Sequence, residues 1–403
     1  MFTLRYSLTF FYLFELEQNV RDSACRSIQN IQPGEKAEGD FSLLFYQTKS
    51  KNQSMKKIVR QVLGIDVAQK ELVVCLGRVH DVDWALELYA HRTFPNTGKG
   101  FAAMILWVKK LTMENIPVRY VMEATGVYHE ALAYFLEGKG HDVSVVLPNK
   151  ISNYFRTLDV KTITDKTASE AIARFGLERK LDNWQRPKEI FREMKQLTRE
   201  RGQVVEDRTV SKNQLHAEET QAFPNKKSVA RVKARIKLLN KQEAEIKVEI
   251  ALLVKGEKEV AKSVALICTI PGVGLLTAAT VLAETNGFEL IRSKRQLTSY
   301  AGLDVQEKQS GTSVKGKPKI SKKGNRHLRK ALHMPALSAI RNEERFTTIF
   351  VRLVSKHGVK MKAAVAVQRK LLELIYTLHK TNKPYDKDFP KNAEAKGEQR
   401  MAA

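Results

Sequence analysis

Hydrophobic and polar positions begin to follow a regular pattern after Met55. Five short apolar runs typical of β-strands follow one another, at residues 58–66, 71–76, 85–93, 118–122 and 142–147. Helical spacing is found over residues 98–111, over about 127–138, and from Thr164 to Gly176, where the glycine suits a helix C-cap. Residues 55–185 are therefore predicted to form an α/β domain.

The order of these elements narrows the choice of fold. Three strands, a crossover helix, a fourth strand, a helix, a fifth strand and a final helix follow the element order of the ribonuclease H fold. We therefore predict a ribonuclease H-like N-terminal domain. Residues 1–54 show no sustained periodicity, and we interpret them as a leader, spurious or disordered, upstream of a start at Met55.

The middle of the chain has a different composition. Residues 186–260 are rich in Lys, Arg, Glu, Gln and Leu, and the segments 203–220 and 228–254 contain neither Gly nor Pro. The sequence Phe223-Pro224-Asn225 separates these two segments, which predicts a helical hairpin or coiled coil with a role in oligomerisation. A solvated two-helix spacer within a monomer is the alternative. A second, mostly helical domain is predicted over residues 261–380, followed by a disordered polar tail over 381–403.

Charge indicates the class of partner. The 403 residues include 69 Lys and Arg against 44 Asp and Glu, a net charge of +25, which is typical of proteins that bind nucleic acid. The three cysteines are too scattered for a disulfide framework or a CxxC zinc pair, which favours the reducing cytoplasm. No run approaches the ~20 apolar residues of a membrane span, so no membrane partner is expected.

Three carboxylates lie at the ends of predicted strands or at the start of a predicted helix. Asp66 and Glu123 each close an apolar strand, and Asp165 opens the last helix of the domain. Such acids can converge on a hard divalent cation such as Mg²⁺, which would support phosphoryl transfer. Taken singly, each has a simpler explanation, since an acid at a helix start commonly caps the helix.

A glycine-containing turn lies between two apolar helical stretches at Ile270-Pro271-Gly272-Val273-Gly274. A turn of this kind that opens a helix presents free N–H groups to a phosphate, as in a helix-hairpin-helix motif. We therefore predict that Gly272 and Gly274 contact nucleic acid. A plain hairpin of two helices with no ligand is the alternative.

Residues 306–330 carry nine Lys or Arg and one Glu, and their glycines predict a flexible loop that leads into a helix. The predicted nucleic-acid contacts in this segment are Lys315, Lys317, Lys319, Lys322, Lys323, Asn325, Arg326 and Arg329. Ser310 lies beside Gly311 in this cationic loop and is a candidate nucleophile, although composition alone identifies no base to activate it. Tyr300 is a weaker nucleophile candidate that we assign to the core.

These blocks together resemble the DEDD transposases of insertion-sequence family 110, relatives of the Piv/MooV invertases. The resemblance runs from about Met55 to Tyr385. The blocks that carry it are Gly64-Ile65-Asp66, Glu123-Ala124-Thr125-Gly126, the helix at 161–176, the Pro-Gly turn, and Ser310-Gly311 with the basic segment up to Arg329. The resemblance implies a RuvC-like domain, a coiled coil, and a helical transposase domain with a nucleophilic serine.

The resemblance also implies roles for individual residues and partners. Asp66, Glu123 and Asp165 match the first three acids of the DEDD set and would hold Mg²⁺, and Ser310 matches the serine that forms a 5′-type phosphoserine linkage. The implied partners are element-end and target DNA, a noncoding bridge RNA, and further copies of the chain in a dimer or tetramer. The implied location is the bacterial cytoplasm, in association with the nucleoid.

One position departs from the family pattern. The fourth acid is expected one helical turn after Asp165, but Ala168 stands there. Glu170 lies about 140° round the helix from Asp165 and is a poor substitute. Two rivals to the recombinase therefore stay open: a metal-dependent junction-type nuclease without a covalent intermediate, and an inactive nucleic-acid-binding remnant.

Overall fold

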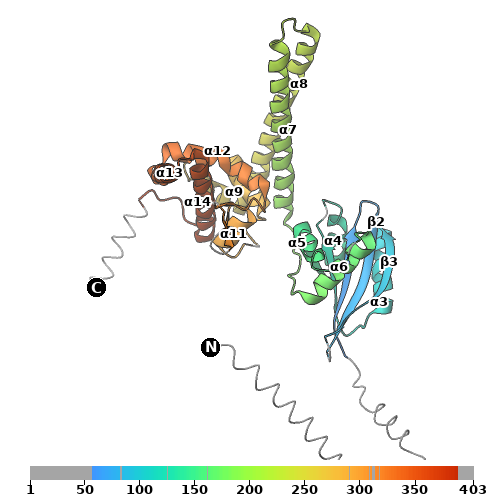
Figure 1. Cartoon of the computed structure of the whole chain (residues 1–403). Helices are drawn as coiled ribbons and strands as arrows, with labels where there is room; N and C mark the ends of the chain where they lie inside the picture. Colours follow the sequence, from blue (N-terminus) through green and yellow to red (C-terminus); the bar gives the residue numbers. More distant parts are fainter. Residues whose placement is uncertain are drawn as a thin grey trace, which may run out of the picture. The chain divides into compact units, whose positions relative to one another are not determined.

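The computed structural model describes residues 57–388, with the exception of residues 82, 83, 125, 161, 290, 308, 311–313 and 317. The chain divides into two compact units, with the boundary between Trp184 and Gln185, and each is described by itself (Figure 1). The predicted leader over residues 1–54 lies outside the described residues, as does the tail from residue 389 onward.

The first unit is built on a five-stranded sheet. Its strands are β1 (Ile58–Val67), β2 (Glu71–His80), β3 (Leu86–Pro95), β4 (Val118–Glu123) and β5 (Asp142–Val146), in the order β3-β2-β1-β4-β5. β1, β2 and β3 pair antiparallel, whereas β4 pairs parallel to β1 and β5 parallel to β4. This mixed sheet has the ribonuclease H-like arrangement that the element order predicts.

Helices cover both faces of the sheet. Those of this unit are α3 (Gly98–Leu111), α4 (Glu130–Glu137), α5 (Pro148–Phe155) and α6 (Asp165–Glu178). Side chains of α3 and α4 pack with alternate residues of β1 and β2, such as Leu63 and Leu72. Side chains of α5 and α6 pack on the opposite face with Val62 and Val121. The helix α5 was not predicted, because it is short and largely polar.

The prediction that Gly176 ends the last helix of this unit is wrong. α6 continues to Glu178, and Gly176 is a buried residue within it. A Cβ atom at Gly176 would come within 2.8 Å of the Val62 and Val121 side chains. Gly64 meets the same helix from β1, since a Cβ there would lie 2.4 Å from Ser169 O. The two glycines thus allow α6 to lie unusually close to the sheet.

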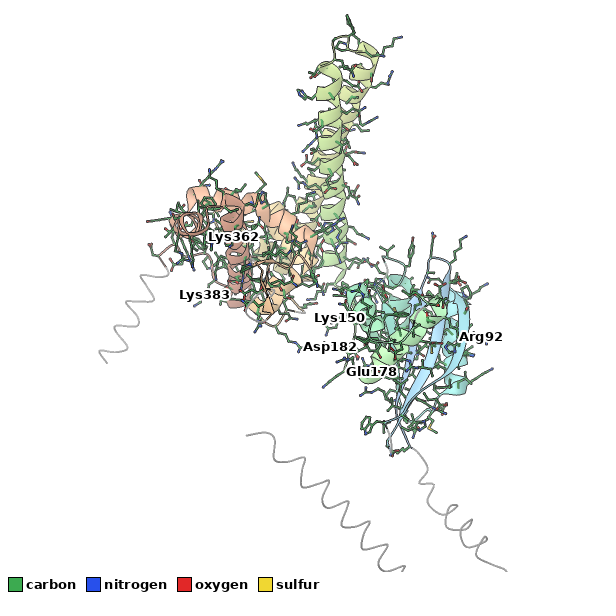
Figure 2. The ribbon with its side chains drawn as sticks, viewed as in Figure 1. Arg92, Lys150, Glu178, Asp182, Lys362 and Lys383 are labelled. Carbon is green, nitrogen blue, oxygen red and sulfur yellow. The ribbon has the colours of Figure 1, made fainter. Side chains whose placement is uncertain are left out.

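The second unit begins with a long helical hairpin, α7 (Glu189–Glu219) and α8 (Lys226–Gly256). The Asn225 side chain accepts hydrogen bonds from Lys227 N and Ser228 N, so it caps α8 and fixes the end of the turn. Phe223 at the tip is 93% exposed. Polar and charged side chains extend from the hairpin along its whole length (Figure 2).

The rest of the second unit is mostly helical. Its helices are α9 (Lys258–Cys268), α10 (Leu275–Glu284), α11 (Lys294–Tyr300), α12 (Arg326–Asn342), α13 (Glu344–His357) and α14 (Lys360–Thr381). Two small ribbons interrupt them: β6 (Val305–Gln306) pairs with β9 (Lys319–Ile320), and β7 (Gln309–Ser310) pairs with β8 (Val314–Lys315). One hydrophobic core joins these helices to the base of the hairpin through Met194. Across the described residues, none of the helices is both long and apolar enough to span a bilayer.

Candidate active site

Strand register brings two of the predicted acids together. Ile65 on β1 pairs with Met122 on β4 in parallel register, so the residues that follow, Asp66 and Glu123, are neighbours at the end of the two strands. Gly64 faces α6, and side chains two residues apart lie on the same face of a strand. Asp66 and Glu123 therefore lie on the face of the sheet that α6 covers.

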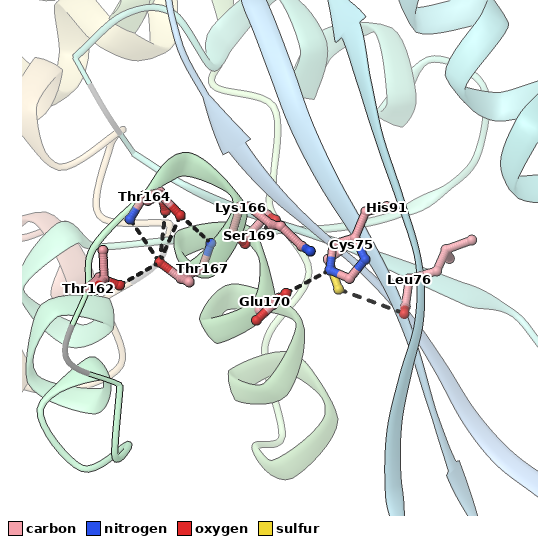
Figure 3. Close-up of polar contacts among 9 residues, drawn as sticks. All are labelled: Cys75, Leu76, His91, Thr162, Thr164, Lys166, Thr167, Ser169 and Glu170. Carbon is pink, nitrogen blue, oxygen red and sulfur yellow. Dashed lines mark hydrogen bonds and ion pairs between the residues drawn. The ribbon is translucent and has the colours of Figure 1, made fainter.

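The third acid reaches this edge through the start of α6. Thr164 caps the helix: its Oγ1 accepts a hydrogen bond from Thr167 N at 3.2 Å, and Thr167 Oγ1 accepts one from Thr164 N at 2.8 Å (Figure 3). Thr167 Oγ1 also donates to Thr162 O at 3.1 Å, which fixes the incoming chain. Because Asp165 follows the cap directly, its position is set by this double hydrogen bond.

The negative charges of the other two acids act on Asp66. Burial raises the pKa of Asp66 to about 6, and the negative charges of Asp165 and then Glu123 add to that effect. A cluster of repelling carboxylates is a suitable environment for a divalent cation, because the cation would remove the repulsion and oxygen is its preferred ligand.

The side chains of Asp66, Glu123 and Asp165 do not form a finished metal site. Among the described residues, no three His, Cys, Asp or Glu side chains stand in an arrangement that could hold an ion as they are. The donor atoms and the charge of Asp66, Glu123 and Asp165 fit a divalent cation, and their side chains would have to draw closer to bind one.

Glu170 does not take the place of the missing fourth acid. It points toward β3, where its Oε1 lies 2.9 Å from Nε2 of His91 (Figure 3). Cys75 lies buried next to this pair, and burial raises the pKa of its thiol to about 12, followed by the charge of Glu170. Position 168, one turn after Asp165, holds only the methyl group of Ala168.

Ser310 belongs to the second unit and lies at the end of a β-ribbon. It pairs with Val314, and Gln309 pairs with Lys315. The structure does not describe residues 311–313, Lys317, or the side chains of Ser310 and Lys315.

The other residues of the basic segment differ in what they contact. Lys319, Lys322, Lys323 and Arg326 are exposed. Asn325 instead caps α12, accepting from His327 N at 2.9 Å and Leu328 N at 3.2 Å, and donates to Glu284 Oε2 at 2.7 Å.

Arg329 is also held within the protein, since it donates to Ala301 O at 2.7 Å and Gly324 O at 3.2 Å. Asn325 and Arg329 thus hold the loop that carries the exposed cations.

The two glycines of the Pro-Gly turn also have different surroundings. Gly272 has φ +86°, and a Cβ there would come within 2.9 Å of Ala339 N and of Pro335 O on α12, so packing alone requires a glycine. Gly274 precedes α10 and faces open space, with no side chain capping the helix. The start of α10 thus has no side-chain cap from the described residues.

Sequence reasoning missed a buried charge network beside this loop. Glu284, at the end of α10, has a fully buried side chain that binds Arg199 of α7 as well as Asn325. Tyr300, which we assigned to the core, is 41% exposed, and its hydroxyl donates to Glu284 O at 2.9 Å. A negative charge at the last position of a helix is unfavourable because it opposes the helix dipole. The position of Glu284 in the sequence could therefore have indicated that a cation lies nearby.

Comparison with known proteins gives two family matches. Residues 63–224 match the DEDD_Tnp_IS110 family, described as a transposase, and residues 264–350 match the Transposase IS116/IS110/IS902 family. The pilin gene-inverting protein of Moraxella bovis is 28% identical over 336 residues, which cover 81% of this chain and 97% of that protein.

Two further similarities are more partial. An uncharacterised 43.6 kDa protein of the insertion element IS110 of Streptomyces coelicolor is 26% identical over 129 residues, 32% of each chain. Among solved structures, Thermus thermophilus RuvC matches with a TM-score of 0.22 and 12% identity, covering 28% of this chain and 90% of that chain.

The two family matches together span more than half of the chain, and they contain its acidic segment and its basic segment. The chain therefore belongs to the IS110 family of DEDD transposases and is a DNA transposase/recombinase enzyme.

Proposed function

We propose that this transposase exchanges DNA strands with two sets of groups: the carboxylates of Asp66, Glu123 and Asp165, and the hydroxyl of Ser310. The observation that supports the first set best is the parallel register of β1 and β4, which places Asp66 beside Glu123, and the raised pKa of Asp66 agrees with it. DEDD transposases as a class generally depend on divalent metal ions. The pilin gene-inverting relatives are named for a rearrangement of DNA, which fits strand exchange between two sites.

In the proposed reaction, Ser310 Oγ attacks a DNA phosphorus. An Oγ–P bond forms, the P–O3′ bond breaks, the serine proton is lost, and the departing 3′ oxygen takes up a proton. The free 3′ hydroxyl of another strand then attacks the phosphoserine, which joins the strands and restores the serine. The three carboxylates would hold Mg²⁺, which when bound stabilises the negative charge on the phosphate oxygens.

The basic side chains are proposed to hold the nucleic acid. The exposed cations Lys319, Lys322, Lys323 and Arg326 would contact phosphates, together with Lys315 and Lys317. The start of α10 after Gly274, which no side chain of the described residues caps, suits one further phosphate. A noncoding bridge RNA would select the DNA sites, and a dimer or tetramer would supply the sites for both DNA partners.

The test is a covalent adduct between protein and DNA. The purified full chain would be incubated with Mg²⁺, the RNA flanking its element, and labelled donor and target DNA, and a DNA-linked protein band is expected after denaturation. Ser310→Ala should remove the band, whereas Ser321→Ala, a serine of the same loop whose hydroxyl is held by Asp304, should leave it. Asp66→Asn should also remove it.

Other outcomes distinguish the rivals. An adduct that survives Ser310→Ala would contradict the serine and direct attention to another nucleophile. Cleavage without any adduct would favour the metal-dependent nuclease. An inert protein that still binds DNA and RNA, and that Ala168→Asp activates, would be the disabled remnant.

A further inference from the structure

The half of α8 that begins at the tip of the hairpin carries charge of one sign. Residues 226–241, called here the distal segment, contain seven Lys or Arg and no Asp or Glu. The rest of α8, residues 242–256, contains three Glu and two Lys. A solvated helix commonly alternates the two signs along its surface, so the distal segment departs from that pattern. Its cations, all of them exposed, are Lys226, Lys227, Arg231, Lys233, Arg235, Lys237 and Lys241.

Helical spacing gathers these cations on the face of α8 that points away from α7. Val232 and Leu239 are buried and mark the face that packs on α7. Most of the cations form two rows on the solvent side, with successive members one helical turn apart. The rows are Lys227-Arg231-Arg235 and Lys233-Lys237-Lys241. Ala230 and Ala234, which are exposed and uncharged, lie between the rows.

Few of these cations have an acidic partner within the protein. Lys233 Nζ lies 2.8 Å from Glu219 Oε1, and Lys241 Nζ lies 3.7 Å from Glu245 Oε1. The other five form no salt bridge with the described residues. Most of the positive charge of the distal segment is therefore not balanced by acids of the same molecule.

This arrangement opposes the stability of α8 itself. Lys226 and Lys227 lie in the first turn, which contains no acid, so their charges face the positive end of the helix dipole. The two rows also repeat like charges four residues apart, which destabilises a helix. A bound polyanion would offset both effects, whereas a second copy of the same face would add to the repulsion.

The distal segment is accessible to a large partner. Figure 1 shows the tip of the hairpin extending away from the helices α9–α14 of the same unit. At 1.5 Å per residue the segment is about 24 Å long, which matches about seven base pairs of a duplex. Two helices side by side are wider than the major groove, which measures about 12 Å, so α8 backed by α7 can contact only the backbone of a duplex.

We infer that the distal segment of α8 binds the phosphate backbone of duplex DNA without regard to base sequence. DNA is the polyanion on which a transposase acts, and phosphate contacts position a protein without reading bases. Residues 226–241 lie outside both ranges that match the transposase families. The inference depends neither on Ser310 as nucleophile nor on the three carboxylates as metal ligands.

The test measures the affinity of the full chain for a labelled DNA duplex of about two helical turns. Fluorescence anisotropy would be recorded over a range of salt concentrations, without Mg²⁺ so that no strand is cut. The triple variant Lys227→Gln, Arg231→Gln, Arg235→Gln should bind at least about tenfold more weakly. The slope of log affinity against log salt should become shallower by about 2–3, because each lost phosphate contact removes about 0.9. The loss should be equal for two duplexes of unrelated sequence.

The matched control removes the same charge elsewhere in the same unit. Lys255→Gln, Lys258→Gln and Lys262→Gln together neutralise three exposed cations at the end of α8 and on α9, and should leave the slope unchanged. Thermal unfolding would confirm that both triple variants are folded, and the distal variant should unfold at the wild-type temperature or above it. If it does not fold, Lys226→Gln with Lys237→Gln should make the slope shallower by about 2.

Three outcomes would overturn the inference. The first is a slope that the distal variants leave unchanged or lower only as much as the control does. The second is a loss of affinity for an RNA duplex of the same length with none for DNA, which would assign the segment to RNA. The third is a change in subunit number by mass photometry with unchanged DNA affinity, which would make the segment a contact between copies. Because no cleavage is measured, an inactive recombinase would leave each outcome readable.

Discussion

Arg199 of α7 binds Glu284 of α10 with both arms of its guanidinium, Nε to Oε1 at 2.7 Å and Nη2 to Oε2 at 2.9 Å. Although burial alone would raise the pKa of Glu284, the hydrogen bonds from Arg199 and Asn325 lower it overall. Because Asn325 also caps α12, a single carboxylate joins the base of the hairpin, the end of α10 and the basic loop.

Removing this carboxylate should destabilise the second unit. Glu284→Ala leaves Arg199 and Asn325 without their acceptor, and breaking such a buried pair costs about 3 kcal/mol. Denaturant unfolding would measure the loss. Glu206→Ala is the control, because Glu206 also joins α7 to α12, through Lys330, but is exposed and should leave the unfolding midpoint unchanged. Equal effects of the two variants would contradict the importance of burial.

The hairpin should lose stability in acid through Glu243. This buried residue of α8 binds Arg201 and Lys247, each at 2.9 Å, and also Arg208. Although burial acts to raise it, the pKa of Glu243 is lowered to about 2 by hydrogen bonds from Lys247, Arg201 and Arg208. The pKa of Glu243 is lower in the folded protein than its value near 4.3 in the unfolded chain, so the ionised carboxylate stabilises the folded state above about pH 4. This stabilisation is lost as the pH falls from about 4 toward 2.

The measurement is thermal unfolding by circular dichroism at pH 5 and pH 2.5. Glu243→Gln should be destabilised at pH 5 by about 1 kcal/mol, with screening of the partly exposed cations taken into account, and by much less at pH 2.5. Glu245→Gln, an exposed partner of Lys241, should behave as wild type at both values. A deficit of Glu243→Gln that is the same at both pH values would show that its charge is not the cause.

A methyl group should have opposite effects at two helical glycines. Gly176→Ala would place a Cβ 2.8 Å from the Val62 and Val121 side chains and should cost about 1–3 kcal/mol as α6 is forced off the sheet. Gly202→Ala in α7 meets nothing within 4 Å and should stabilise by about 0.5–1 kcal/mol. Urea unfolding of both variants would measure the sign of each change in the free energy of unfolding. If Gly176→Ala left that free energy unchanged, the Val62 and Val121 side chains would have moved to make room for the methyl group.

These glycines show which parts of the fold are visible in the sequence. The sheet and the start of α6 could be predicted because alternation and the Thr164 cap are local signals. The sequence analysis interpreted Gly176 as a helix end, because local rules associate glycine with C-caps. The structure requires a glycine there for a different reason, which is the close approach of α6 to two valines of the sheet. Contacts of that kind depend on which helices and strands pack together, and the local sequence does not show this.

In the candidate site, too, some features could be predicted from the sequence and others depend on tertiary contacts. Asp66 and Glu123 could be placed together because each ends a strand of one sheet. The roles of Asn325 and Arg329 could not be separated from those of the neighbouring lysines, because their partners, Glu284 and Ala301, lie far away in the sequence. Charge composition indicates a phosphate-binding loop but does not show which cations the protein itself uses.

Restoring an acid at position 168 should strengthen metal binding. Ala168→Asp places a carboxylate one turn after Asp165, on the same side of α6, so a fourth oxygen donor joins the cluster. We expect the affinity for Mn²⁺, used as a spectroscopic probe in place of Mg²⁺, to rise about tenfold by electron paramagnetic resonance, and DNA cleavage to rise with it. Glu170→Gln is the control, because Glu170 is engaged with His91 and should leave Mn²⁺ affinity unchanged. If instead Glu170→Gln lowers the affinity for Mn²⁺, the Glu170 side chain turns toward the metal. Asp66, Glu123 and Asp165 would then not be the complete set of acidic ligands.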